Sequence, residues 1–155
     1  MLLVDTSAWV EVFRRNPLIT LDDITDDRDR IATCLPVIQE VLQGFGDERA
    51  FRIAQTAMYA LPCVEGPLGR IIIDSAVDLF RRARRAGVTV RSGTDCLIAA
   101  CAVRHGLTVV HSDRDYRHLA RIAPLQQVDL APLIARRRPA AEKRLVSSVE
   151  GKKDT

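Results

Sequence analysis

The stretch Ser92–Tyr116, which reads SGTDCLIAACAVRHGLTVVHSDRDY, contains the elements that decide the fold. Its middle, from Cys96 to Val103, is apolar on every side, which predicts a helix that is buried all round. Gly106 is placed to end this helix, and Leu107–His111 then reads as a strand. A helix of about 11 residues, at ~1.5 Å per residue, and a strand of about five residues, at ~3.3 Å per residue, are both about 16 Å long. The chain is therefore expected to return to the edge of a sheet from which it left.

Carboxylates stand at both ends of this helix and strand. Asp95 opens the helix, directly after Ser92, Gly93 and Thr94, which are residues that suit a turn and an N-cap. Asp113 and Asp115 follow the strand. We expect Asp95 and Asp113 to lie on the same rim of the sheet, with Asp115 one alternation further along and able to point to the same side.

The rest of the chain alternates between strand and helix patterns. Strands are predicted at 1–4, 30–34, 63–64, 88–91 and 128–130, and helices at about 7–16, 36–44, 48–61 and 68–86. Residues 18–30 carry five aspartates without apolar periodicity and are predicted to form a solvated connection. This alternation favours an α/β fold, in which a mainly parallel sheet is covered by helices on both faces.

Composition indicates one soluble domain. The chain has 155 residues, of which 47% are hydrophobic and 28% are charged, enough for a substantial core. A membrane-length apolar run and a signal peptide are both lacking, so we expect a cytoplasmic protein without a membrane partner. The four cysteines form no CxxC pair and no zinc spacing with the three histidines, which favours reduced, mostly buried thiols.

The positive net charge belongs to the end of the chain. From Arg136 onward there are seven Lys+Arg and three Asp+Glu, which leaves 16 Lys+Arg and 17 Asp+Glu in residues 1–135. We expect a folded domain at 1–134 and a basic tail at 135–155, flexible or a single frayed helix. Arginines 81, 82, 84 and 85 end a predicted helix, where they either complement the helix dipole or contact phosphate.

Four carboxylates, those of Asp5, Glu40, Asp95 and Asp113, each follow a predicted strand within a few residues. Each alone suits an N-cap or a solvated first turn, but together on one rim they would repel one another unless they share protons or bind a cation. Without matching His or Cys ligands the expected ion is Mg²⁺ or Mn²⁺, singly or as a pair that suits phosphodiester hydrolysis. The hydroxyls of four residues either orient these carboxylates or are plain caps: Thr6, Ser7, Thr94 and Ser112.

Four phrases carry a resemblance to a known family: VDTSAWVE at Val4–Glu11, LPVIQEVLQGF at Leu35–Phe45, GTDCLIAACAVRHGLTVV at Gly93–Val110, and HSDRDY at His111–Tyr116. Together they resemble the PIN-domain ribonucleases, and in particular the VapC-type toxins of bacterial toxin–antitoxin pairs. The resemblance extends from Met1 to about Leu133. It implies a PIN-like α/β/α sandwich with a central, mainly parallel sheet.

The resemblance also implies an activity. It is that of an endoribonuclease in which a water activated by Mg²⁺ or Mn²⁺ attacks a phosphodiester in structured RNA, commonly tRNA or ribosomal RNA. Asp5, Glu40, Asp95 and Asp113 match the family's acidic quartet, and Asp115 matches an acid that some members add. Members usually form homodimers and are inhibited by a small antitoxin whose C-terminal segment covers the acidic pocket. The basic tail is longer than the family pattern, and we expect it to assist RNA binding through screened charge.

Other protein classes fit less well. A haloacid-dehalogenase enzyme requires a second Asp where Ser7 stands, and a signalling receiver domain requires a lysine in the body, whereas every lysine lies in the tail. Two alternatives stay open: a non-catalytic protein that keeps the fold and binds RNA or a partner, and a PIN nuclease that acts without an antitoxin.

Overall fold

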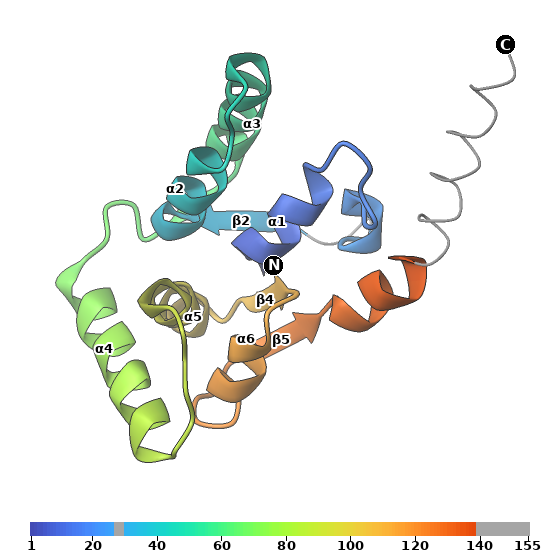
Figure 1. The fold of residues 1–155 in the computed structure, drawn as a ribbon. Helices are drawn as coiled ribbons and strands as arrows, with labels where there is room; N and C mark the ends of the chain where they lie inside the picture. Colours follow the sequence, from blue (N-terminus) through green and yellow to red (C-terminus); the bar gives the residue numbers. More distant parts are fainter. Residues whose placement is uncertain (27–29, 139–155) are drawn as a thin grey trace, which may run out of the picture.

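The structure is a computed structural model that describes residues 1–26 and 30–138 (Figure 1). The strands are β1 (Leu2–Val4), β2 (Ile31–Cys34), β3 (Cys63–Val64), β4 (Thr108–His111) and β5 (Gln126–Asp129). The helices are α1 (Thr6–Val12), α2 (Leu35–Gln43), α3 (Glu48–Ala60), α4 (Arg70–Arg85), α5 (Gly93–His105) and α6 (Arg114–Leu119). A 3₁₀ turn covers Leu21–Asp23, and residues 131–138 are also helical.

The strands form one parallel sheet in the order β3-β2-β1-β4-β5. The chain first moves outward from β1 to β2 and β3, and then crosses back to add β4 on the other side of β1. Right-handed crossovers in these two directions place the connecting helices on opposite faces, so the predicted α/β architecture is confirmed. Adjacent strands whose connections leave in opposite directions open a crevice at their carboxyl ends. Here that crevice lies beyond β1 and β4.

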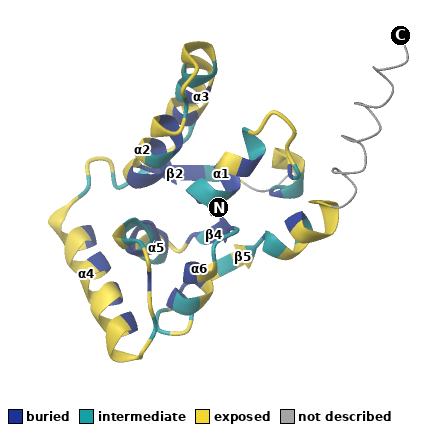
Figure 2. Cartoon of the chain, viewed as in Figure 1, coloured by how far each residue is buried: buried dark blue, intermediate teal, exposed yellow. Residues whose placement is uncertain are grey.

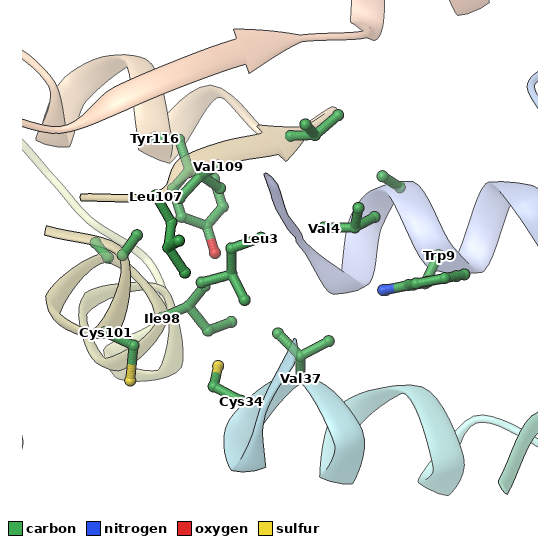
Figure 3. Close-up of a cluster of buried hydrophobic side chains, with 14 of the residues drawn as sticks. Leu3, Val4, Trp9, Cys34, Val37, Ile98, Cys101, Leu107, Val109 and Tyr116 are labelled. Carbon is green, nitrogen blue, oxygen red and sulfur yellow. The ribbon is translucent and has the colours of Figure 1, made fainter. Parts of the chain in front are cut away.

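The central helix α5 is buried as its apolar sequence predicts. Ile98, Cys101 and Ala102 have no exposed surface, and Figure 3 shows Ile98 in the same buried cluster as Leu3 and Tyr116. Gly106 ends the helix in the left-handed region with φ 61°, and the Leu107 amide then bonds back to the Ala102 carbonyl at 2.9 Å. The chain thus enters β4 alongside β1, which brings the ends of α5 and β4 to the same rim.

Helix α4 covers the helix predicted at about 68–86 and lies against α5 through an apolar stripe. Ile72, Ala76, Leu79 and Ala83 are buried, and Figure 2 shows the outer side of α4 as exposed. In the arginine cluster at its end, Arg82 donates a hydrogen bond to the Ile122 carbonyl. Arg82 and Arg85 each form an ion pair with Asp78. Ion pairing along the helix therefore accounts for two of these arginines.

Three of the sequence predictions differ from the structure. Val88–Arg91 is not a strand of the sheet, and the Arg91 amide donates to a side chain, that of Asp115. Residues 18–26 are less solvated than predicted, since Ile19 is fully buried beside the 3₁₀ turn. The helix at 131–138 extends past the predicted domain end at residue 134.

Arg137 fixes that helix to the body. Its guanidinium bonds to both carboxylate oxygens of Asp23, at 2.6 and 2.7 Å, and to the Leu18 carbonyl at 3.0 Å. The remainder of the predicted tail, 139–155, lies outside the described residues. Among the described helices, none is both long and apolar enough to cross a membrane. The four cysteines are free thiols, of which Cys63 is exposed and the other three are buried.

Candidate active site

Asp5 stands at the carboxyl end of β1 and is 3% exposed. It is the N-cap of α1: one carboxylate oxygen accepts the Ser7 amide at 2.8 Å and the Ser7 hydroxyl at 2.5 Å. The other oxygen accepts the phenolic O–H of Tyr116 at 2.6 Å. Since each carboxylate oxygen offers two lone pairs, the second oxygen keeps one for a further ligand. Capping and ligand binding are therefore compatible for Asp5.

Ser7 also joins the two strands that border the crevice. Its hydroxyl oxygen accepts the backbone amide of Ser112, at the end of β4, at 2.9 Å. The Ser7 side chain thus adds to the backbone bonds that already pair β1 with β4, including that from the Asp5 amide to the Val110 carbonyl. This contact fixes the separation between Asp5 and the residues that follow Ser112.

Glu40 and Asp95 reach the rim from α2 and α5. One oxygen of Glu40 accepts the hydroxyl of Thr6 at 2.8 Å, which ties α2 to the start of α1. Asp95 lies in the first turn of α5, whose N-cap is Ser92, with the Ser92 hydroxyl accepting the Thr94 amide at 3.1 Å. Within the described residues, no donor contacts the Asp95 carboxylate, so its oxygens are the least committed in the site.

Asp113 and Asp115 follow β4 and share a cation. Asp113 is the N-cap of α6 and accepts the Asp115 amide at 3.0 Å. The Arg91 guanidinium contacts Asp113 at 2.6 Å and Asp115 at 3.3 Å, and the Arg91 amide donates to Asp115 at 2.8 Å. Asp115 is fully buried, and its other oxygen has no hydrogen-bond partner in the described chain. Sequence reasoning did not predict a role for Arg91.

The acids of the rim interact electrostatically with Asp95. The pKa of Asp95 is raised from an ordinary value of 3.8 to about 7, first by burial and then by the carboxylates of Asp5, Asp113, Asp115 and Glu40, in that order of importance. Burial, followed by the charge of Asp5, also raises the pKa of Tyr116 well above its ordinary value, so the phenol stays a donor. The sequence prediction that these acids meet at one rim is therefore consistent with their mutual repulsion.

The donor set suits a hard divalent cation held partly through water. All five side chains offer carboxylate oxygen, which is what Mg²⁺ and Mn²⁺ prefer. In the described part of the chain, however, no three acidic, His or Cys side chains are grouped tightly enough to surround one ion. The residues fit an ion that takes one or two carboxylates directly and reaches the others through water, which is the usual coordination of Mg²⁺ in proteins.

The four hydroxyl residues predicted to orient the acids have different environments. Thr6 and Ser7 donate to Glu40 and Asp5. Ser112 instead donates its hydroxyl to the Ser7 carbonyl at 3.4 Å, and the Thr94 hydroxyl contacts none of the five acids among the described residues. Tyr116 is a further residue that sequence reasoning missed. It could have been suspected because a tyrosine that is buried next to acids needs an acceptor for its hydroxyl.

Similarity to known proteins agrees with this geometry. The PIN domain family model matches residues 2–122. Ribonuclease VapC11 of Mycobacterium tuberculosis and VapC ribonuclease Mb1587 of Mycobacterium bovis are each 40% identical to this chain, over 81% of the chain and 96% of the relative.

Solved structures share the fold. A structure of VapBC2 from Rickettsia felis, bound to a DNA fragment from its promoter, has a TM-score of 0.67 at 16% identity and covers 83% of this chain and 97% of that one. DNA-bound VapBC from Salmonella typhimurium has a TM-score of 0.66 at 19% identity, covering 83% and 96%. With the family model and the two relatives, the conclusion is that the chain belongs to the PIN-domain family and, within it, to the VapC proteins.

Proposed function

We propose that this protein is a Mg²⁺- or Mn²⁺-dependent endoribonuclease that hydrolyses phosphodiester bonds in structured RNA, with tRNA or ribosomal RNA as the expected substrates. The observation that carries the proposal is the convergence of five carboxylates from distant segments on the crevice beyond β1 and β4. The names of the relatives, which are ribonucleases, support the choice of RNA.

The residues of the site have separate tasks in this proposal. Asp5, Glu40 and Asp95 would hold the ion, with Asp113 and Asp115 completing the negative pocket. A bound Mg²⁺ or Mn²⁺ would neutralise charge on the phosphate and lower the pKa of an attacking water. The Ser7 and Tyr116 hydroxyls fix the orientation of Asp5, and the Thr6 hydroxyl fixes that of Glu40. Such supporting contacts typically change metal affinity about 10-fold to 100-fold when removed.

The partners in this proposal are an antitoxin and a second copy of the chain. The solved structures with the same fold include VapBC complexes, and their titles support a toxin that pairs with an inhibitor. An open acidic crevice is the surface that such an inhibitor would cover. Purification of the protein co-expressed with the product of a neighbouring short reading frame tests this: a stable complex without RNA cleavage is expected, and separate elution with full activity would favour a PIN nuclease that acts without an antitoxin.

The direct test of activity is to sequence the RNA ends that the purified protein produces with Mn²⁺. Asp95→Asn keeps nearly the same shape but removes a negative charge, so we expect a folded variant with no metal-dependent cleavage. Asp5→Ala should also be inactive, and Asp74→Asn, at an exposed ion pair on α4, should cleave at the same sites as the wild type. Wild-type cleavage by well-folded Asp95→Asn would refute the assignment.

A non-catalytic PIN-fold binding protein is the second candidate. It is favoured by the fact that no three described side chains of ligand type surround a single point. A metal titration separates the two candidates, because an acidic pocket that works with an ion should be stabilised by it. If millimolar Mg²⁺ or Mn²⁺ neither binds nor raises the melting temperature, the binding protein is the better description.

A further inference from the structure

Two arginines at the end of α4 have no acidic partner in the described part of the chain. Arg82 and Arg85 pair with Asp78. Arg81 and Arg84 are exposed, and neither contacts a carboxylate or donates a side-chain hydrogen bond among the described residues. The helix dipole favours a positive charge at this end of α4, but it leaves the guanidinium donors of Arg81 and Arg84 free for a ligand.

Arg84 lies between two hollows in the surface. The first has a volume of about 340 Å³ and is lined by Phe80, Arg84 and residues 87–90. The second has a volume of about 420 Å³ and is lined by Arg81, Arg84 and Arg85. The Phe80 side chain is 41% exposed. An accessible aromatic ring thus borders one hollow, and guanidinium groups border the other.

The hollow beside Phe80 adjoins the acidic site along the chain. Its wall at 87–90 runs directly into Arg91, whose guanidinium contacts Asp113 at 2.6 Å, and Figure 1 shows this connection between the end of α4 and the start of α5. Gly87 precedes Arg91 by four residues, which a fully extended chain spans in about 14 Å. The hollow therefore lies within a few nucleotides of a phosphate bound at the crevice.

We propose that these two hollows bind the RNA beside the cleaved bond, with an unpaired base against Phe80 and a phosphate against Arg81 and Arg84. The inference rests on the proposed function and deepens it by naming a subsite for the substrate. Aromatic rings and arginines are the side chains that hold unpaired bases and their phosphates in single-stranded segments of RNA. Arginines without an acidic partner bind a phosphate without first breaking an ion pair.

A second copy of the chain is the other occupant to consider for an exposed phenylalanine. In a symmetric contact centred on Phe80, each copy would place Arg81 and Arg84 close to the same two arginines of the other copy. Like charges at such a contact repel one another. The charge of this surface therefore favours RNA over a second copy.

The role of the arginines is measured by the salt dependence of binding. The probe is a fluorescent hairpin RNA with a mixed-sequence loop, bound by the full chain with Asp95→Asn, which is expected to bind without cutting. Adding Arg84→Gln should weaken binding at low salt and reduce the slope of log Kd against log salt concentration by about 1, because one phosphate contact is lost. Arg49→Gln, at an exposed arginine on α3, is the matched control and should leave the slope unchanged.

The role of Phe80 is measured by removing single bases from the loop. When one loop nucleotide at a time lacks its base, one position should lose affinity about fivefold or more for the protein with Phe80, because a stacked base is lost. Phe80→Leu keeps an apolar side chain but removes the ring, so the same position should then show little loss. Thermal unfolding and size-exclusion chromatography check that the variant is folded and has the oligomeric state of its parent.

Three results separate the possibilities. Equal losses with and without Phe80 at every loop position, or an unchanged salt slope in Arg84→Gln, would overturn the inference, while cleavage by the wild type with Mn²⁺ would keep the proposed function. A changed oligomeric state in Phe80→Leu with unchanged RNA affinity would assign the ring to a contact between copies and also overturn it. Neither RNA binding nor cleavage by the wild type would remove the proposed function together with the inference.

Discussion

At the scale of single residues, Asp95 differs from the other acids of the site. Asp5 and Glu40 are supported by hydroxyl donors and Asp113 and Asp115 by Arg91, but half-buried Asp95 has no donor among residues 1–26 and 30–138. Its negative charge is therefore the least stable in the ion-free protein. This makes Asp95 the residue at which pH and metal binding have the largest expected effects.

The raised pKa of Asp95 sets the sign of a pH dependence. Since its pKa is about 7 in the folded protein and 3.8 ordinarily, the folded state binds the proton more tightly than the unfolded state. The stabilisation is fully present below about pH 4 and is lost as pH rises through about 7. With a chelator present, urea unfolding at pH 5 to 8 should show the wild type losing stability relative to Asp95→Asn. A difference that stays constant across this range would contradict the assigned pKa.

Tyr116→Phe tests the support of Asp5. The variant removes a buried hydroxyl that donates to the carboxylate at 2.6 Å, and hydrogen bonds to charged groups contribute about 1.5–3 kcal/mol. We expect the free energy of unfolding in urea to fall by about that amount. Tyr59→Phe, at a side chain that is 64% exposed, is the control and should change little. Equal stability of Tyr116→Phe and the wild type would show that the hydroxyl has no such role.

The acids of the site were predictable from sequence, and their partners were not. Asp5, Asp95 and Asp113 follow strands or open helices, so local patterns place them on one rim. Tyr116 and Arg91 contact the acids through tertiary structure. Arg91 in particular lies in a segment that reads as a strand but bonds to Asp115, and no local pattern indicates this.

At the scale of elements, two glycines bound the helix that carries Asp95, and they differ in backbone conformation. Gly106 has φ 61°, a conformation in which other residues are strained. Gly93 lies in the first turn of α5, where an alanine side chain would meet open space. Gly106→Ala should lower the free energy of unfolding by about 1 kcal/mol, and Gly93→Ala should raise it by a few tenths. Thermal unfolding of both variants measures this, and an equal shift in the same direction would contradict the capping role of Gly106.

The helices were more predictable than the connections between them. Apolar periodicity places α2 to α5 within a few residues, because amphipathic and fully apolar patterns are local properties. Val88 and Val90 alternate like a strand, yet the segment bonds to Asp115 instead of a neighbouring strand. For the start of the tail, a frayed helix was one of two predicted alternatives, and its contact with Asp23 was not predictable, because Asp23 is more than a hundred residues distant in the chain.

At the scale of the whole molecule, the predicted basic tail divides into two parts. Arg136, Arg137 and Arg138 lie in the helix at 131–138, and Arg137 is paired with Asp23. Residues 139–155 then contain four Lys+Arg and three Asp+Glu, so most of the basic excess belongs to the three arginines. The tail prediction accordingly needs two truncations to test it.

Truncation after Ile134 should weaken RNA binding more at low salt than at high salt, since it removes the three arginines and their screened attraction to phosphate. Truncation after Arg138 should have a much smaller effect. Filter binding of RNA to the Asp95→Asn background at two salt concentrations measures both. If the two truncations lose affinity equally, residues 139–155 carry the interaction instead. Unchanged affinity in both would remove the C-terminal region from RNA binding.

The central claim is that segments far apart in the chain meet around one divalent ion, and Fe²⁺ in place of Mg²⁺ tests it most directly. With ascorbate and peroxide, bound Fe²⁺ generates radicals that cut the polypeptide close to the ion, and mass spectrometry locates the cuts. The predicted result is cleavage near Asp5, Glu40 and Asp95 together, suppressed by excess Mg²⁺ and absent in Asp95→Asn. Cuts that fall on only one of these segments, or that persist unchanged in Asp95→Asn, would contradict a shared ion site.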